Sequence, residues 1–171
     1  ALLDPFNLKQ TNILSWYNKD DRYSRQVLNG DLESLRSFYM DNGYLDFKIN
    51  SSLIRISENK KHVYIDISID EGNKYTFAGS DLTGKFGNVP EKLLKAQIGT
   101  YFGKVFSRSE VTATTARLNQ ILGDYGYAFS NANAIPEVDK EERTVAFNYF
   151  IDPGKKIYVR RINFFGNEKT K

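Results

Sequence analysis

The chain has 171 residues, of which 40% are hydrophobic, 26% are charged and 14% are aromatic, and its formal net charge is +3. Such a composition is typical of globular proteins and supplies more core material than disordered chains have, while the charge is too small for a strongly basic nucleic-acid binder. With no cysteine and one histidine, a thiolate nucleophile is excluded, and we expect no metal site and no cofactor.

No apolar run approaches the ~20 residues that a membrane helix needs. The N-terminus reads Ala1-Leu2-Leu3-Asp4-Pro5, which meets charge and proline too early for a signal peptide. We therefore expect any targeting segment to have been removed or to lie outside this chain.

The first predicted element is an amphipathic helix that ends before Gly43. Glycine just after a helix adopts the left-handed conformation that satisfies the last carbonyl groups. The apolar residues of the predicted helix recur at the spacing of one helical face; they are Leu28, Leu32, Leu35 and Tyr39.

Two predicted strands follow, over residues 47–56 and 63–70, and the polar residues 57–62 form the turn between them. In the second strand, apolar and polar residues alternate, which indicates a sheet with one buried face. The apolar members of this alternation are Val63, Ile65, Ile67 and Ile69.

The same elements recur about 83 residues later, which indicates an internal repeat. Tyr23-Ser24-Arg25 returns as Phe106-Ser107-Arg108, and Asp41-Asn42-Gly43-Tyr44 returns as Asp124-Tyr125-Gly126-Tyr127. A second amphipathic helix and a second alternating strand accompany them, through Val111, Thr115, Leu118, Leu122 and Tyr125 and then Val145, Phe147, Tyr149 and Ile151.

A short glycine turn ends each copy and leads into a further predicted strand, which itself runs to a glycine. The turns are Glu71-Gly72-Asn73 and Pro153-Gly154. Pro90, which follows the strand of the second copy, suits the first turn of another helix. The sequence thus predicts an α+β protein of tandem β-α-α-β-β modules: residues 1–72 lacking the first strand, residues 73–153 complete, and residues 154–171 as the first strand of a following module.

This order of helix, Gly-Tyr, hairpin, turn and strand resembles the POTRA domains of the BamA family of outer-membrane protein assembly factors. Residues 30–39 with Gly43-Tyr44 resemble the third such domain, and Glu71-Gly72 with Gly126-Tyr127-Ala128 resembles the fourth. Residues 158–167 are similar to the start of the fifth. The resemblance covers essentially the whole chain.

The resemblance implies that each module has a three-stranded mixed sheet covered by two helices, with the first strand of the hairpin at an edge. It also implies a non-catalytic scaffold on the periplasmic face of the Gram-negative outer membrane, attached at its C-terminal side to a membrane β-barrel. Such arms recruit accessory lipoproteins and handle unfolded outer-membrane protein clients, and no nucleic acid is among the implied partners.

The edge strand is the first candidate for partner contact. The unpaired backbone groups of an edge can template another strand. The matching edge of the second module carries Pro136, which has no N–H to donate. The candidate residues are Phe47, Lys48, Ile49, Asn50, Leu53, Ile54, Arg55 and Ile56, of which Lys48 and Arg55 are charges of the kind that protect edges.

Two further groups of residues are candidates for a role in this arm. Lys155, Lys156, Arg160 and Arg161 are the densest basic cluster and could meet anionic headgroups, an acidic partner or a neighbouring module. Because the turns between modules are very short, Gly72 and Gly154 are predicted pivots with a limited set of hinge angles.

Several patterns could indicate chemistry instead. Residues 79–86 nearly spell a phosphate-binding loop, but Phe86 stands where a magnesium-binding hydroxyl is needed. His62 lacks an evident orienting carboxylate, and the acidic pairs Asp20-Asp21, Asp70-Glu71 and Glu141-Glu142 fall in predicted turns or loops. The alternatives to an assembly scaffold are a POTRA region of another transporter of the same superfamily, for two-partner secretion or translocation, an RNA-binding α+β module, and a carboxylate hydrolase.

Overall fold

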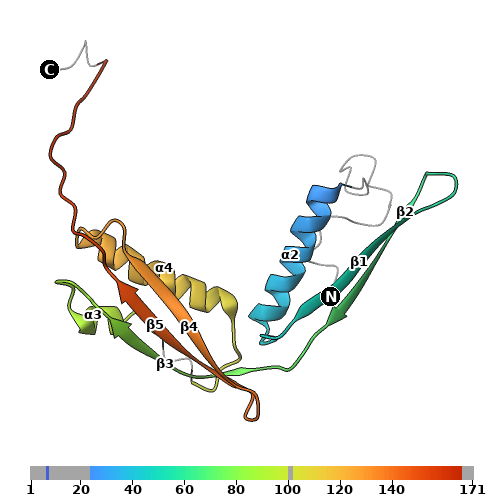
Figure 1. The fold of residues 1–171 in the computed structure, drawn as a ribbon, viewed down its shortest axis with the longest axis horizontal. Helices are drawn as coiled ribbons and strands as arrows, with labels where there is room; N and C mark the ends of the chain where they lie inside the picture. Colours follow the sequence, from blue (N-terminus) through green and yellow to red (C-terminus); the bar gives the residue numbers. More distant parts are fainter. Residues whose placement is uncertain (1–6, 8–23, 100–101, 167–171) are drawn as a thin grey trace. The chain divides into compact units, whose positions relative to one another are not determined.

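A computed structural model describes residue 7 and residues 24–99 and 102–166 (Figure 1). No helix within these ranges is both long and apolar enough to span a bilayer. By its contacts the chain divides into a first unit, residues 1–79 with 100–112 and 136–146, and a second unit, residues 80–99 with 113–135 and 147–171. The elements are α2 (Arg25–Asp41), β1 (Lys48–Ile56), β2 (Val63–Asp70), β3 (Thr76–Gly84), α3 (Glu91–Lys95), α4 (Arg108–Asp124), β4 (Asn131–Asp139) and β5 (Thr144–Asp152).

Three of the four residues predicted for the buried face of α2, Leu28, Leu35 and Tyr39, are buried, whereas Leu32 is half-buried and the neighbouring Asp31 is buried. The N–H of Asn42 donates to the carbonyls of Phe38 (3.2 Å) and Tyr39 (3.0 Å) and so closes the last turn. Gly43 then has a φ of 101°, which confirms the predicted left-handed glycine after the helix.

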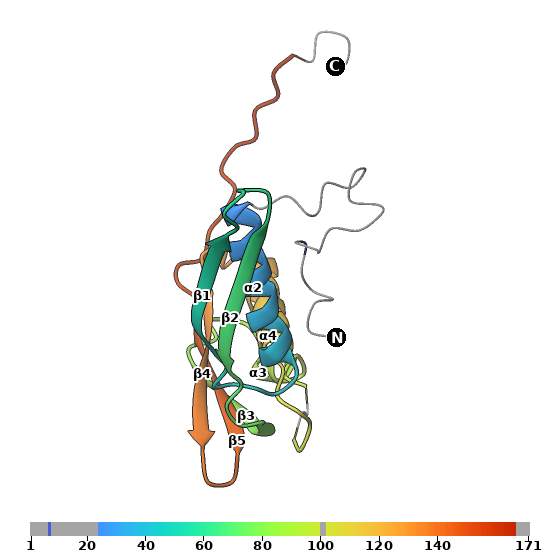
Figure 2. The same cartoon turned by 90° about the vertical axis from the view of Figure 1, so that its right-hand side faces the viewer.

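Strands β1 and β2 pair in an antiparallel hairpin, with Ile54 opposite Ile65 and a register shift between Ile49 and Ser51. The hairpin lies along α2 (Figures 1 and 2). Between them lies a core of Leu35, Tyr39 and Phe47, against which Tyr44, Ile49, Ile67 and Ile69 pack.

The second sheet has three strands in the order β3-β5-β4, so β5 is central and β4 lies at an edge. The N–H of Thr76 donates to Arg143 O (3.1 Å), and the N–H of Lys85 donates to Ile151 O (3.0 Å). Residue numbers therefore rise together along β3 and β5, which makes this pairing parallel, whereas β4 and β5 are joined by a tight turn. The predicted three-stranded mixed sheet, with the first hairpin strand at its edge, is confirmed.

Strand β5 alternates as its sequence predicts, with Val145, Phe147, Tyr149 and Ile151 buried. The two helices of this module bury Leu94 of α3 and Leu118 and Leu122 of α4, all with 0% exposure. The chain therefore buries one face of each helix and one face of the sheet, the α+β arrangement that the repeat implies.

Two stretches differ from their simplest interpretation. Residues 79–84, part of the stretch that nearly spells a phosphate-binding loop, continue β3 as far as Gly84, because this stretch is bound to β5; the Thr83 hydroxyl donates to Asn148 Oδ1 (2.7 Å). Residues 153–165 form no strand. A strand needs a hydrogen-bonding neighbour, so the expectation that these residues open a further module stays a prediction, as do the module limits.

Candidate functional site

Strand β1 is an edge of its sheet, because β2 is its only neighbour among the described strands. At the closed end of the hairpin the N–H of Ser57 donates to His62 O (3.0 Å). Backbone groups alternate in direction along a strand, so the N–H groups of Leu53 and Arg55 point to β2. Those of Ser52, Ile54 and Ile56 point to the open edge, where three donors are available to an added strand.

The side chains around these donors are apolar and accessible. Leu53 is 62% exposed, Ile54 37% and Ile56 65%. Alternate residues of a strand face opposite sides, so Leu53 lies on one face of the hairpin and the two isoleucines on the other. An incoming strand would meet apolar surface above and below the ladder.

Arg55, one of the two charged residues predicted to protect the edge of β1, is engaged in contacts with β2. Arg55 donates through Nε to Asp66 Oδ2 (2.8 Å) on β2, and its guanidinium lies 6.0 Å from the centre of the Tyr64 ring. Both contacts hold the guanidinium over the hairpin and away from the open edge. Lys48, at the start of β1, is exposed.

Phe47 is predicted as a contact residue of the edge strand, but the structure places its side chain in the core. Its side chain is 2% exposed and its ring stacks on Tyr39, with centroids 4.2 Å apart and planes at 9°. Ile49 is also half-buried against this core. The remaining predicted residues, Lys48, Asn50, Leu53, Ile54, Arg55 and Ile56, all lie in β1.

A polar contact that the sequence pattern does not reveal fixes the base of the hairpin. The Tyr39 hydroxyl donates to Glu71 Oε1 (2.7 Å), just past the end of β2. Burial, and then the hydrogen bond and negative charge of Glu71, raise the pKa of Tyr39 to about 12. Tyr75 makes a similar contact: its hydroxyl donates to Asp46 Oδ2 (2.7 Å), and this bond is the main cause of its raised pKa.

The raised pKa of Tyr39 predicts a loss of stability at high pH. The folded state keeps the proton up to about pH 12, whereas the unfolded chain loses it near pH 10. The contribution is thus complete below pH 10 and disappears as the pH rises from 10 to 12. Urea denaturation between pH 9 and roughly pH 12 should show a steeper decline for the parent chain than for Tyr39→Phe. Parallel declines would contradict the assignment.

The two predicted pivots have the same local geometry. Gly72 and Gly154 have φ values of 67° and 64°. Their N–H groups donate to the carboxylates of Asp70 (3.2 Å) and Asp152 (3.1 Å), two residues earlier. Each turn is therefore built around a glycine that a side chain would strain. Motion about these turns stays a prediction.

The basic cluster lies in the stretch that forms no strand. Lys155, Lys156, Arg160 and Arg161 are all exposed. The ammonium of Lys156 lies 6.0 Å from the centre of the Tyr127 ring and 5.9 Å from that of Tyr158. Lys156 therefore lies beside two aromatic rings although it is exposed.

Most of the described groups that could indicate chemistry lie in or beside turns, but Asp70 of the pair Asp70-Glu71 is the last residue of β2 rather than a turn residue. His62 is exposed beside the turn of the first hairpin, and the N–H groups of Glu141 and Glu142 donate to Asp139 Oδ1 in the turn of the second. Asp20-Asp21 lies outside the described residues. No group of three or more potential metal ligands is found within the described ranges.

A protein-family model described as "POTRA: Surface antigen variable number repeat" matches residues 4–72 and 75–154. Among curated proteins, the outer membrane protein assembly factor BamA of Neisseria meningitidis serogroup B is 31% identical over 170 residues, 99% of this chain. BamA of Buchnera aphidicola subsp. Acyrthosiphon pisum is 33% identical over 158 residues, 91% of this chain. The chain spans only 21% and 25% of the length of these two relatives.

Solved structures give the same picture of the fold. The crystal structure of Haemophilus influenzae BamA POTRA3-5 matches with a TM-score of 0.73 at 25% identity, over 88% of this chain and 59% of that one. Haemophilus ducreyi BamA lacking POTRA domains 1–3 matches with a TM-score of 0.63 at 17% identity, over 83% of this chain and 27% of that one, which supports the fold alone.

Proposed function

Because this chain belongs to the POTRA family, we propose that it is a non-catalytic segment of the periplasmic arm of an outer-membrane β-barrel assembly factor. The similarity to BamA proteins along almost the whole chain supports an assembly factor over a secretion transporter or an RNA-binding module. The proposed partners are accessory lipoproteins, unfolded outer-membrane protein clients and a membrane β-barrel on the C-terminal side.

The observation that carries the proposal is the open edge of β1. Three outward N–H groups, at Ser52, Ile54 and Ile56, face the side of β1 that no described strand occupies. Main-chain hydrogen bonds give affinity with little side-chain selectivity. That recognition suits clients which differ in sequence but share the extended conformation of a barrel strand.

The second module is a weaker acceptor in this proposal. Its edge strand β4 is the repeat equivalent of β1. Strand β4 includes Pro136, which has no N–H and so interrupts the row of backbone donors. Client contact is therefore assigned to the first module. The basic cluster of Lys155, Lys156, Arg160 and Arg161 is proposed to contact acidic surfaces. The turns at Gly72 and Gly154 are proposed to orient the modules.

A peptide copying one strand of an outer-membrane β-barrel tests the proposal directly. Upon titration, the amides of Ser52, Ile54 and Ile56 are expected to gain protection from hydrogen exchange, whereas those of Leu53 and Arg55, already bound to β2, change little. Ile54→Pro removes an outward donor and keeps the ladder to β2, so binding should weaken about tenfold, roughly the loss of one well-made contact.

The control separates backbone from side-chain recognition. Ile54→Thr keeps the N–H and a β-branched shape but shortens the apolar surface, so we expect it to retain most of the affinity. Equal losses for both variants would assign binding to the side chain. Full binding by Ile54→Pro, with unchanged circular dichroism, would remove β1 from the proposed function.

A further inference from the structure

Asp41 occupies an unfavourable position in its own helix. It is the last residue of α2, where the helix dipole places negative partial charge and a carboxylate is destabilising. Its Oδ1 accepts a hydrogen bond from the N–H of Ser109 (2.7 Å) and from the hydroxyl of Ser107 (3.3 Å). All three residues belong to the first unit. The carboxylate therefore acts on the other helix, α4.

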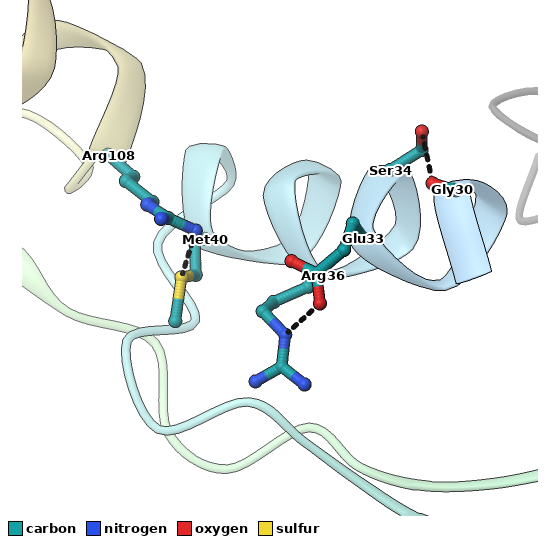
Figure 3. Close-up of polar contacts among 6 residues, drawn as sticks. All are labelled: Gly30, Glu33, Ser34, Arg36, Met40 and Arg108. Carbon is teal, nitrogen blue, oxygen red and sulfur yellow. Dashed lines mark hydrogen bonds and ion pairs between the residues drawn. The ribbon is translucent and has the colours of Figure 1, made fainter.

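The start of α4 needs this acceptor. Ser107 precedes the helix; its hydroxyl accepts a long hydrogen bond from Glu110 N (3.4 Å) and shares a second hydrogen bond with the Ser109 hydroxyl (2.8 Å). The N–H of Ser109 has no partner within its own first turn, since the first amides of a helix have none. Asp41 supplies the partner and places negative charge at the positive end of α4. Arg108 adds a contact to Met40 Sδ (3.7 Å; Figure 3).

The loop that follows Asp41 forms a backbone hydrogen bond with the start of the second module. Gly43 O accepts a hydrogen bond from Tyr75 N (2.8 Å). The same bond recurs in the second copy, where Gly126 O accepts from Ile157 N (2.9 Å). The turn between modules is therefore anchored on the loop after the long helix in both copies.

A lysine repeats with this backbone contact. The ammonium of Lys74 lies 6.0 Å from the centre of the Tyr44 ring, and that of Lys156 lies 6.0 Å from the centre of the Tyr127 ring. Such placements are attractive. The second copy thus repeats the backbone contact and the lysine of the first, and its helix also ends in an aspartate, Asp124, which is exposed.

We propose that the aspartate ending each long helix is a joint residue: Asp41 caps α4, and the surface of Asp124, Gly126 and Lys156 receives the start of the corresponding helix of a following module. The partner is defined by its chemistry. It is a helix N-terminus with a free second amide and a serine hydroxyl just before the helix. The inference rests on the proposed array of modules but not on client binding at β1.

The Asp41 contact is tested in the full chain. Asp41→Ala is expected to lower the protection of the Ser109 amide from exchange about fivefold, the loss typical of a helix cap. The distance distribution between spin labels at Ser37 and Thr112, which both belong to the first unit, should broaden. Ser109→Pro removes the same N–H in a first turn that tolerates proline, and the double variant should broaden no further.

Asp124→Ala is the matched control within residues 1–171, because the described residues after Asp124 contain no helix that the equivalent carboxylate could cap. It should change neither measurement. In a tandem chain that repeats residues 85–153 after Gly166, Asp124→Ala should lower the protection of Ser109 in the added copy by the same factor. Unchanged exchange on Asp41→Ala would overturn the joint, and unchanged exchange in the tandem variant would overturn the surface at Asp124. Strand-peptide binding measured on the same samples distinguishes either failure from that of the proposed function.

Discussion

Replacing Phe47 by alanine is expected to lower the free energy of unfolding by about 3–5 kcal/mol, the usual cost of removing a buried phenylalanine ring. The ring is 2% exposed and stacks on Tyr39, and both belong to the core beneath the hairpin. Its removal leaves a cavity between α2 and β2 that neither element can fill without breaking its own hydrogen bonds. Urea denaturation followed by circular dichroism measures the change, with the midpoint shifting at a similar slope.

Phe129 provides the matched control for this substitution. It follows the Gly-Tyr pair of the second copy much as Phe47 follows that of the first, but it is 79% exposed. Phe129→Ala should therefore change the free energy of unfolding by no more than about 0.5 kcal/mol. If Phe47→Ala were equally mild, the ring would not be part of the core and would return to the proposed contact surface of β1.

The position of Phe47 shows where the sequence pattern stops being informative. Residues 47–56 read as one continuous extended run, so the pattern groups the first residue with the strand. The structure ends the loop at Phe47, because its N–H donates to Tyr44 O (3.2 Å) and its ring turns to Tyr39. A shift of one residue moves a side chain to the other face of a sheet. Only tertiary contacts determine which face the Phe47 ring takes.

The elements that the sequence predicts correctly are those whose periodicity reports burial directly. The alternation of β5 and the helical spacing in α2 each reflect one buried face. Internal repetition strengthens the prediction, since two copies have to satisfy one architecture. The mixed sheet comes from the family resemblance, because strand order depends on contacts between distant residues.

The polar contacts that organise the joint and the hairpin base are not predictable in this way. Tyr39 and Glu71 are 32 positions apart, and Asp41 and Ser109 are 68 apart. No local rule pairs such residues. One signal is present in the sequence: Asp41 and Asp124 occupy equivalent positions at helix C-termini, where a carboxylate is disfavoured. A disfavoured residue that recurs in a repeat points to a partner outside its own helix.

Gly84→Ala is expected to destabilise the second sheet by about 3–5 kcal/mol, through backbone strain and steric overlap together. Gly84 has a φ of 101°, outside the range that alanine adopts readily. A Cβ there would overlap the carbonyl oxygen of Ile151 and lie 2.9 Å from its amide nitrogen. Because Ile151 lies in the central strand, β5 can move aside only by giving up its pairing. Urea denaturation should show the loss.

Two other glycines separate the causes of that loss. Gly166, the repeat equivalent of Gly84, has a φ of 79° with nothing within 4 Å of the position that a Cβ would take, so Gly166→Ala tests conformational strain without overlap. Gly123 lies within α4, has open space around it and no positive φ, so Gly123→Ala should stabilise the protein by roughly 0.5–1 kcal/mol. A Gly84→Ala variant as stable as Gly166→Ala would mean that β3 does not approach β5 as closely as its parallel pairing requires, and the architecture shared with the POTRA structures would then fail at its central contact.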